Sequence, residues 1–145
     1  MAQKSGIKNL KAFQDKLEKR LLKNPEKHLK NLVARSTAIV EGHAKQSIAS
    51  GSPSGRTYTR GSISHIASAA GQPPATDTGF LVSNITSRVK TEGTTVIGQI
   101  VASAPYAKSL EFGTSNMSAR PFMQPALNKN RAKINRIFKK GGYLK

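Results

Sequence analysis

The side chains that catalysis would require are present in this sequence, but their spacing forms no catalytic set. The histidines are scattered and show no His-Glu-x-x-His pattern. Only three of the seven carboxylates lie after residue 41, too few to indicate a paired-acid site, and the many serines have no evident His and Asp partners. Cysteine is absent, which excludes disulfides and thiolate metal sites. We therefore expect no enzymatic activity, no cofactor and no metal. The residues considered are His28, His43, His65, Asp77, Glu92 and Glu111.

A glycine-rich segment, GSPSGRTYTRG from Gly51 to Gly61, has some features of a phosphate-binding loop. It lacks the Gly-Lys-Ser/Thr ending and does not follow a predicted strand, so we interpret it as a flexible loop. That loop spans residues 51–76, with a short strand allowed at Thr57–Thr59 and a short helix or irregular chain at Ile63–Ala70. Because Gly, Ser, Pro and Thr dominate it, we expect it to be mobile in the isolated subunit and ordered in an assembly.

The basic residues are concentrated at the two ends of the chain. The net charge is +17, with +7 in residues 1–50, +3 in residues 51–127 and +7 in residues 128–145. Such a field favours an acidic partner, which can be nucleic acid, an acidic protein ring or an anionic membrane. No apolar run approaches the roughly 20 residues that span a bilayer. The basic residues of the last helix are candidates for contacts with DNA or an acidic neighbouring protein: Lys129, Arg131, Lys133, Arg136, Lys139 and Lys140.

Two helices are predicted in residues 1–50. The first has an apolar stripe with spacings of three and four residues, and lysines cover its other face. Asn24-Pro25-Glu26 then starts a second helix that runs to about Ser50, since it offers a capping residue, a proline at the first helical position and an acid in the first turn. The first stripe consists of Ile7, Leu10, Phe13, Leu17 and Leu21.

The rest of the chain, residues 77–140, is predicted to form an α+β core. Glu92-Gly93 is a turn signal between Ile85–Lys90 and Thr95–Ser103, which we expect to pair as an antiparallel hairpin. A last helix follows at about Met123–Lys140. The predicted fold class is therefore α+β in a single domain, residues 1–145. It has two N-terminal helices, a small antiparallel sheet, a short helix and a C-terminal helix packed on the sheet.

The stretch from Ala104 to Leu127, APYAKSLEFGTSNMSARPFMQPAL, organises this core. Pro105 suits the start of a helix and Gly113 its end, so a short helix is predicted between them. An acid is unfavourable at a helix C-terminus, so Glu111 needs compensation, and Arg120 is the nearest candidate in sequence, on the same or a neighbouring subunit. The alternative is that Glu111 is simply exposed.

This stretch resembles the signature of the tailed-bacteriophage neck and tail-completion family, which is typified by a lambdoid head-tail joining (minor tail) gene product. A second segment, SAAGQPPATDTGFLVSNI from Ser68 to Ile85, is similar to a run found upstream in that family. The resemblance covers about residues 55–130, with the two motifs in the same order.

The resemblance implies a virion structural protein in the neck or tail, joining the head connector to the tail and forming part of the DNA channel. It further implies a homo-oligomeric ring, here expected to be a hexamer. The implied partners are a head-closure or connector protein, a tail terminator or tail tube protein, and genomic DNA in the lumen, with no membrane. The protein would occupy the host cytoplasm during assembly. The alternative is a free-standing basic nucleic-acid-binding protein.

Within the organising stretch we expect two groups of residues. One group holds the short helix against the sheet, since Tyr106 and Leu110 are four residues apart and share a helix face. The other presents an assembly surface beside it. The expected core residues are Tyr106, Leu110, Phe112 and Phe122, and the expected interface residues are Glu111, Thr114 and Arg120.

Overall fold

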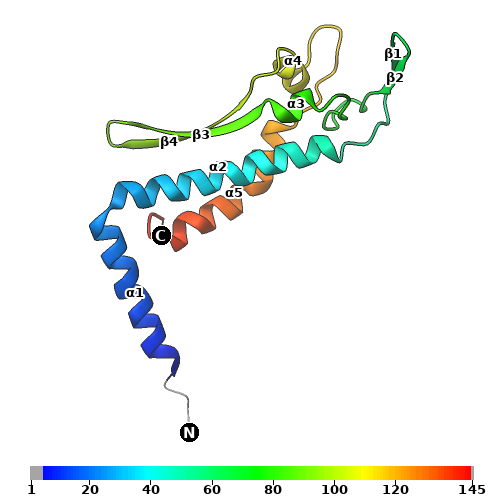
Figure 1. Ribbon diagram of the computed structural model, residues 1–145. Helices are drawn as coiled ribbons and strands as arrows, with labels where there is room; N and C mark the ends of the chain where they lie inside the picture. The colour runs from blue at the N-terminus through cyan, green and yellow to red at the C-terminus, as the bar shows by residue number, and fades with distance from the viewer. Residues whose placement is uncertain (1–4, 145) are drawn as a thin grey trace.

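Two helices that meet at a sharp bend form the N-terminal part of the molecule. A computed structural model describes residues 5–144, in which α1 spans Ser5–Lys23 and α2 spans Pro25–Ala49. Figure 1 shows α1 projecting away from the body of the protein, which is built along α2. The predicted start of α2 is confirmed, because the Asn24 side chain accepts a hydrogen bond from the backbone N–H of Lys27 at 3.3 Å.

The apolar stripe of α1 is not covered by the chain. Leu10 and Phe13 are exposed and Leu17 is half-buried. The side chains of residues 5–9 and 20–22 are outside the described ones, and Ile7 and Leu21 of the predicted stripe are among them.

The predicted hairpin is present and lies against α2. Strands β3 (Ile85–Glu92) and β4 (Thr95–Ala102) pair antiparallel, with Glu92 opposite Thr95 across the turn. Gly93 has a φ of +59°, which a tight turn requires and glycine adopts at little cost. Gly98 lies directly over α2, where a Cβ atom would clash with the side chains of Thr37 and Val33. The close approach of strand and helix therefore depends on this glycine.

The last helix, α5 (Met123–Lys140), lies along α2 (Figure 1). The α+β fold class with its N-terminal and C-terminal helices is confirmed, but one detail differs. The helix that packs on β3 and β4 is α2, while α5 has α2 as its main neighbour. The reason is that α2 buries one broad face, which is wide enough to contact both the β3–β4 hairpin and α5. The buried core cluster is Val40, Ala44, Ile48, Leu81, Ile85, Ala104, Ala107, Phe122 and Ala126.

Residues 50–79 form an extension at the far end of α2, which carries a second hairpin. Strands β1 (Thr57–Arg60) and β2 (Ile63–Ile66) pair antiparallel around Gly61. A helix within Ile63–Ala70 is therefore wrong, since the Gly61-Ser62 dipeptide makes a two-residue hairpin turn. The short helices α3 (Phe80–Ser83) and α4 (Ala107–Phe112) connect this end to the core. The mobility of residues 51–76 stays a prediction.

Candidate assembly site

The junction between α4 and α5 is the centre of the candidate site. Helix α4 ends at Gly113, which has φ +75° and ψ −179°, a conformation that is essentially confined to glycine. A Cβ atom at Gly113 would lie 2.8 Å from the carbonyl oxygen of Met117 and 2.9 Å from the nitrogen of Ala119. The chain can therefore fold back tightly here only because this residue has no side chain.

Glu111 caps the N-terminus of α5 through three hydrogen bonds. Its Oε2 accepts the backbone N–H of Phe122 at 2.8 Å and that of Met123 at 3.0 Å, and its Oε1 accepts that of Gln124 at 2.8 Å. Phe122, at the N-cap position, makes no side-chain cap of its own. The carboxylate thus satisfies backbone donors that a helix start leaves free, and its negative charge meets the positive end of the helix dipole.

Arg120 does not compensate Glu111 within the same chain, so that form of the hypothesis is wrong, and a contact with Arg120 of a neighbouring subunit stays a prediction. The Arg120 Nε donates to the carbonyl oxygen of Ser68 at 3.0 Å, and its backbone N–H donates to the carbonyl of Leu110 at 2.7 Å. Next to it, the Ala119 carbonyl accepts the N–H of Gly71 at 2.9 Å. These contacts fasten the extension of residues 50–79 to the loop between α4 and α5.

The four expected core residues are divided between the interior and the surface. Phe122 is the largest fully buried side chain, at 1% exposure, and Leu110 is half-buried against the core cluster. Phe112 is 75% exposed, so its assignment to the core is wrong. It lies two residues after Leu110, and residues two apart do not share a helix face. Tyr106 is 44% exposed and packs beside Phe80, with ring centroids 6.3 Å apart, so it too lies outside the core.

Of the three expected interface residues, two bind other parts of the same chain through their side chains. Glu111 and Arg120 are half-buried and make the contacts described above. Thr114 is exposed and its backbone pairs with Met117 across a small turn. A role for all three in assembly stays a prediction, and Thr114 is the one whose side chain is exposed, with its Oγ1 accepting the N–H of Asn116 at 3.3 Å inside the turn.

An apolar groove of about 460 Å³ runs between β4, α4 and α5. Phe112 and Leu127 border it, and both are largely exposed. Helix α5 buries Ala126 but leaves the next residue, Leu127, at the surface. We call this surface the α4–α5 groove, defined by Ile100, Ala107, Phe112, Met123 and Leu127.

A second hollow, of about 670 Å³, lies between the β1–β2 hairpin and α3, and no pattern in the sequence predicts it. Asp77 lies 3.3 Å from Arg60 Nη2 and 3.9 Å from His65 Nδ1 within its lining. The histidine distance is longer than a hydrogen bond, so the two groups are not arranged for proton transfer. The Ser68 Oγ is buried there without a hydrogen-bond partner among the described residues.

The basic residues predicted to contact DNA or an acidic protein all lie exposed along α5. Within residues 5–144 none of them takes part in an ion pair. They therefore form a charged surface of unneutralised cations: Lys129, Arg131, Lys133, Arg136, Lys139 and Lys140.

The described residues offer little for membrane or metal chemistry. None of the helices in residues 5–144 combines the length and the apolar character needed to cross a membrane. In the same part of the chain, His, Asp and Glu side chains form no group of three or more suited to hold a metal ion.

Comparison with protein families gives one match. The model of the family described as "Bacteriophage HK97-gp10, putative tail-component" matches residues 11–113, which contain most of α1 and all elements from α2 to α4. Comparisons with curated proteins and with solved structures gave no significant match.

Proposed function

The chain belongs to the HK97-gp10-like family of bacteriophage tail components, and on that premise we propose that it acts at the phage neck as a tail-completion protein. It would join the head connector to the tail, with a head-closure or connector protein on one side and a tail terminator or tail tube protein on the other. The observation that carries this proposal is the family match over residues 11–113. The role is structural, without enzymatic activity, and assembly takes place in the host cytoplasm.

We further propose that copies of the chain associate into a closed ring of six, with genomic DNA in the lumen. A contact between unlike surfaces closes into a ring when the rotation permits. The chain has two unlike apolar surfaces that it does not cover itself, the α4–α5 groove and the α1 stripe at Leu10 and Phe13. Figure 1 shows that α1 points away from the body, so it is available to a neighbouring molecule.

Phe112 offers the sharpest test of this interface. Phe112→Ser should leave the thermal melt of the isolated chain unchanged, because the side chain is 75% exposed, but should reduce complementation of a phage that lacks the gene. Ile63→Ser is the matched control, since Ile63 is 58% exposed on the distant hairpin. Normal particle assembly by the Phe112→Ser variant would remove the groove from the interface.

The function itself is tested by cryo-electron microscopy of particles that contain the chain. We expect a ring of density for this fold at the head–tail junction. A single copy there, a two-fold dimer, or a location elsewhere in the particle would contradict the proposal.

A second function, free nucleic-acid binding, is favoured by the net charge of +17 and the uncompensated α5 cations. If this were the main activity, the isolated chain would bind DNA tightly, with a steep salt dependence, and would not be found in purified particles.

A further inference from the structure

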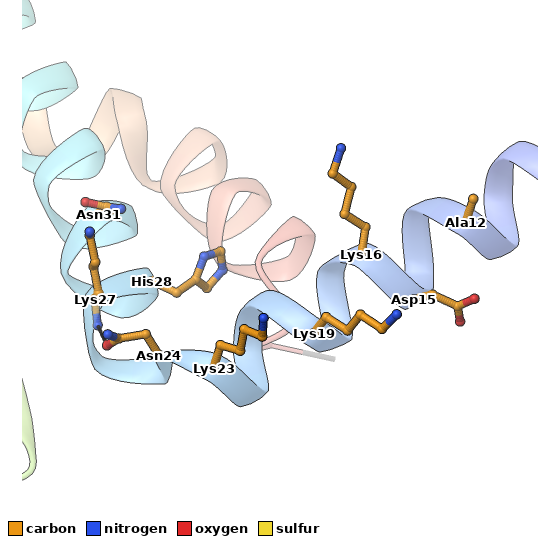
Figure 2. A pocket seen from close by; sticks show the side chains of 9 residues that line it. All are labelled: Ala12, Asp15, Lys16, Lys19, Lys23, Asn24, Lys27, His28 and Asn31. Carbon is orange, nitrogen blue, oxygen red and sulfur yellow. Dashed lines mark hydrogen bonds between the residues drawn. The ribbon is translucent and has the colours of Figure 1, made fainter.

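The bend between α1 and α2 forms a groove that is rich in lysine. It has a volume of about 810 Å³ and is lined by residues of both helices. Figure 2 shows these side chains around the bend, with α1 on one side and the first turns of α2 on the other. Of the nine described residues that line it, four are lysines and one, Asp15, is an acid: Ala12, Asp15, Lys16, Lys19, Lys23, Asn24, Lys27, His28 and Asn31.

The lysines line the same groove because of helix geometry and the bend together. Lys16, Lys19 and Lys23 are three and four residues apart, so they share one face of α1. That face is separate from the apolar stripe at Leu10 and Phe13. Lys27 lies in the first turn of α2, where the positive end of the helix dipole adds to the lysine charges.

The C-terminal end of the chain joins this groove. The Tyr143 hydroxyl donates to the carbonyl oxygen of Pro25 at 3.0 Å, and the Tyr143 ring stacks on His28 with centroids 5.8 Å apart. These contacts place the end of α5, with Lys139 and Lys140 in its last turn, beside the bend. The two basic ends of the sequence are thus brought to one region of the surface.

The lining determines what kind of anion fits. A docking site for an acidic protein would be expected to contain a buried apolar or aromatic anchor point, and among the described lining residues Ala12 is the only apolar one. Lysine and asparagine side chains are typical donors to phosphate oxygens. The described residues that line the groove include no Phe, Tyr or Trp, so they offer no stacking platform for unpaired bases. The His28 Nε2 is buried without a hydrogen-bond partner among the described residues.

We propose that the α1–α2 groove binds the phosphate backbone of double-stranded DNA. The lysines provide the attraction, the asparagines provide neutral donors, and the docked C-terminus extends the basic surface towards α5. Binding of this kind is independent of base sequence and strongly salt-dependent. The proposal does not depend on the neck role, because it concerns a property of the isolated chain.

The test is fluorescence anisotropy of a short labelled DNA duplex, titrated with the full chain over a series of salt concentrations. Lys19→Gln/Lys23→Gln removes two positive charges from the groove. We expect the slope of log K against log salt to become shallower by roughly 1.8, since each phosphate contact contributes about 0.9. The affinity should fall roughly tenfold or more at moderate salt.

Arg56→Gln/Lys108→Gln is the matched control, because it removes the same charge from exposed positions at the other end of the molecule. We expect this variant to keep the slope of the unmodified chain. Equal losses in the two variants would mean a diffuse positive field, and would overturn the proposal. So would stronger groove-dependent binding of poly-glutamate than of DNA, which would assign the groove to an acidic protein. Circular dichroism of each variant checks that it is folded.

Discussion

The backbone N–H groups at the starts of α2 and α5 are capped in two different ways. Each helix begins with backbone N–H groups that have no partner inside the helix. At α2 the partner is local: Asn24 caps Lys27 at 3.3 Å, and its surroundings are exposed and rich in lysine. At α5 the partner is distant in sequence and partly buried: Glu111 accepts three N–H groups at 2.8 to 3.0 Å.

Contacts within the chain stabilise the α4–α5 junction, whereas the α1–α2 bend is exposed and positively charged. Around α5, the carboxylate and the N–H groups satisfy each other, and Phe122 fills the core beneath them. Around α2, none of the four lysines of the α1–α2 groove forms an ion pair with a described residue. We therefore expect the α4–α5 junction to govern stability and the α1–α2 bend to govern binding.

The largest effect is expected from Phe122→Ala, which removes the main apolar contact of the α4–α5 junction. Loss of a buried phenyl ring should lower the free energy of unfolding by about 3–5 kcal/mol, measured by urea denaturation. Phe112→Ala is the control and should change it by less than about 0.5 kcal/mol, because that ring is 75% exposed. Similar losses in both would mean that the two rings are buried alike.

Glu111→Ala should have the next largest effect, since it leaves three N–H groups at a partly buried helix start without their partner. We expect a loss of about 2–3 kcal/mol in the free energy of unfolding. Glu111→Gln should cost less, because an amide oxygen can still accept. Hydrogen exchange at the amides of residues 122–124 should rise in the alanine variant. An unchanged exchange rate there would contradict the capping role.

Asn24→Ala tests the helix cap at the α1–α2 bend. It should lower the free energy of unfolding by about 1 kcal/mol, the usual value for a local N-cap. The same denaturation experiment compares it directly with Glu111→Ala. If Asn24→Ala lowered the free energy of unfolding as much as Glu111→Ala or more, the proposed difference between the α1–α2 bend and the α4–α5 junction would be contradicted.

The smallest effect is expected at Glu41, on the α2 surface that faces β3. The hydrogen bond from Lys45, at 2.6 Å, and a further one from Ser87 lower the pKa of the Glu41 carboxyl. A lowered pKa in the folded state stabilises the fold at neutral pH, and this contribution disappears as the pH falls through the folded-state pKa. Glu41→Gln should therefore cost less than about 1 kcal/mol at pH 7 and nothing in strong acid. Urea denaturation at both pH values checks this.

Local signals in the sequence were sufficient for much of the fold. Three features were predictable: the start of α2 at Asn24-Pro25-Glu26, the turn at Gly93 between two strands rich in β-branched residues, and the end of α4 at Gly113. Each depends on a residue type that acts within a few positions of itself, through capping, restricted φ or freedom to adopt positive φ. The two motifs that carry the family resemblance could likewise be recognised from the sequence, in the same order as in the family.

The partners of the charged and aromatic residues in the site were decided by the tertiary structure. Glu111 was paired with Arg120 by proximity in sequence, but the fold turns its carboxylate to the start of α5 and sends Arg120 to Ser68. Phe112 and Phe122 are the same residue type within one motif, yet one is exposed and the other buried. The two basic ends of the chain meet because α5 packs along α2 and Tyr143 contacts Pro25 and His28. Such pairings depend on how whole elements pack, and local sequence does not contain that information.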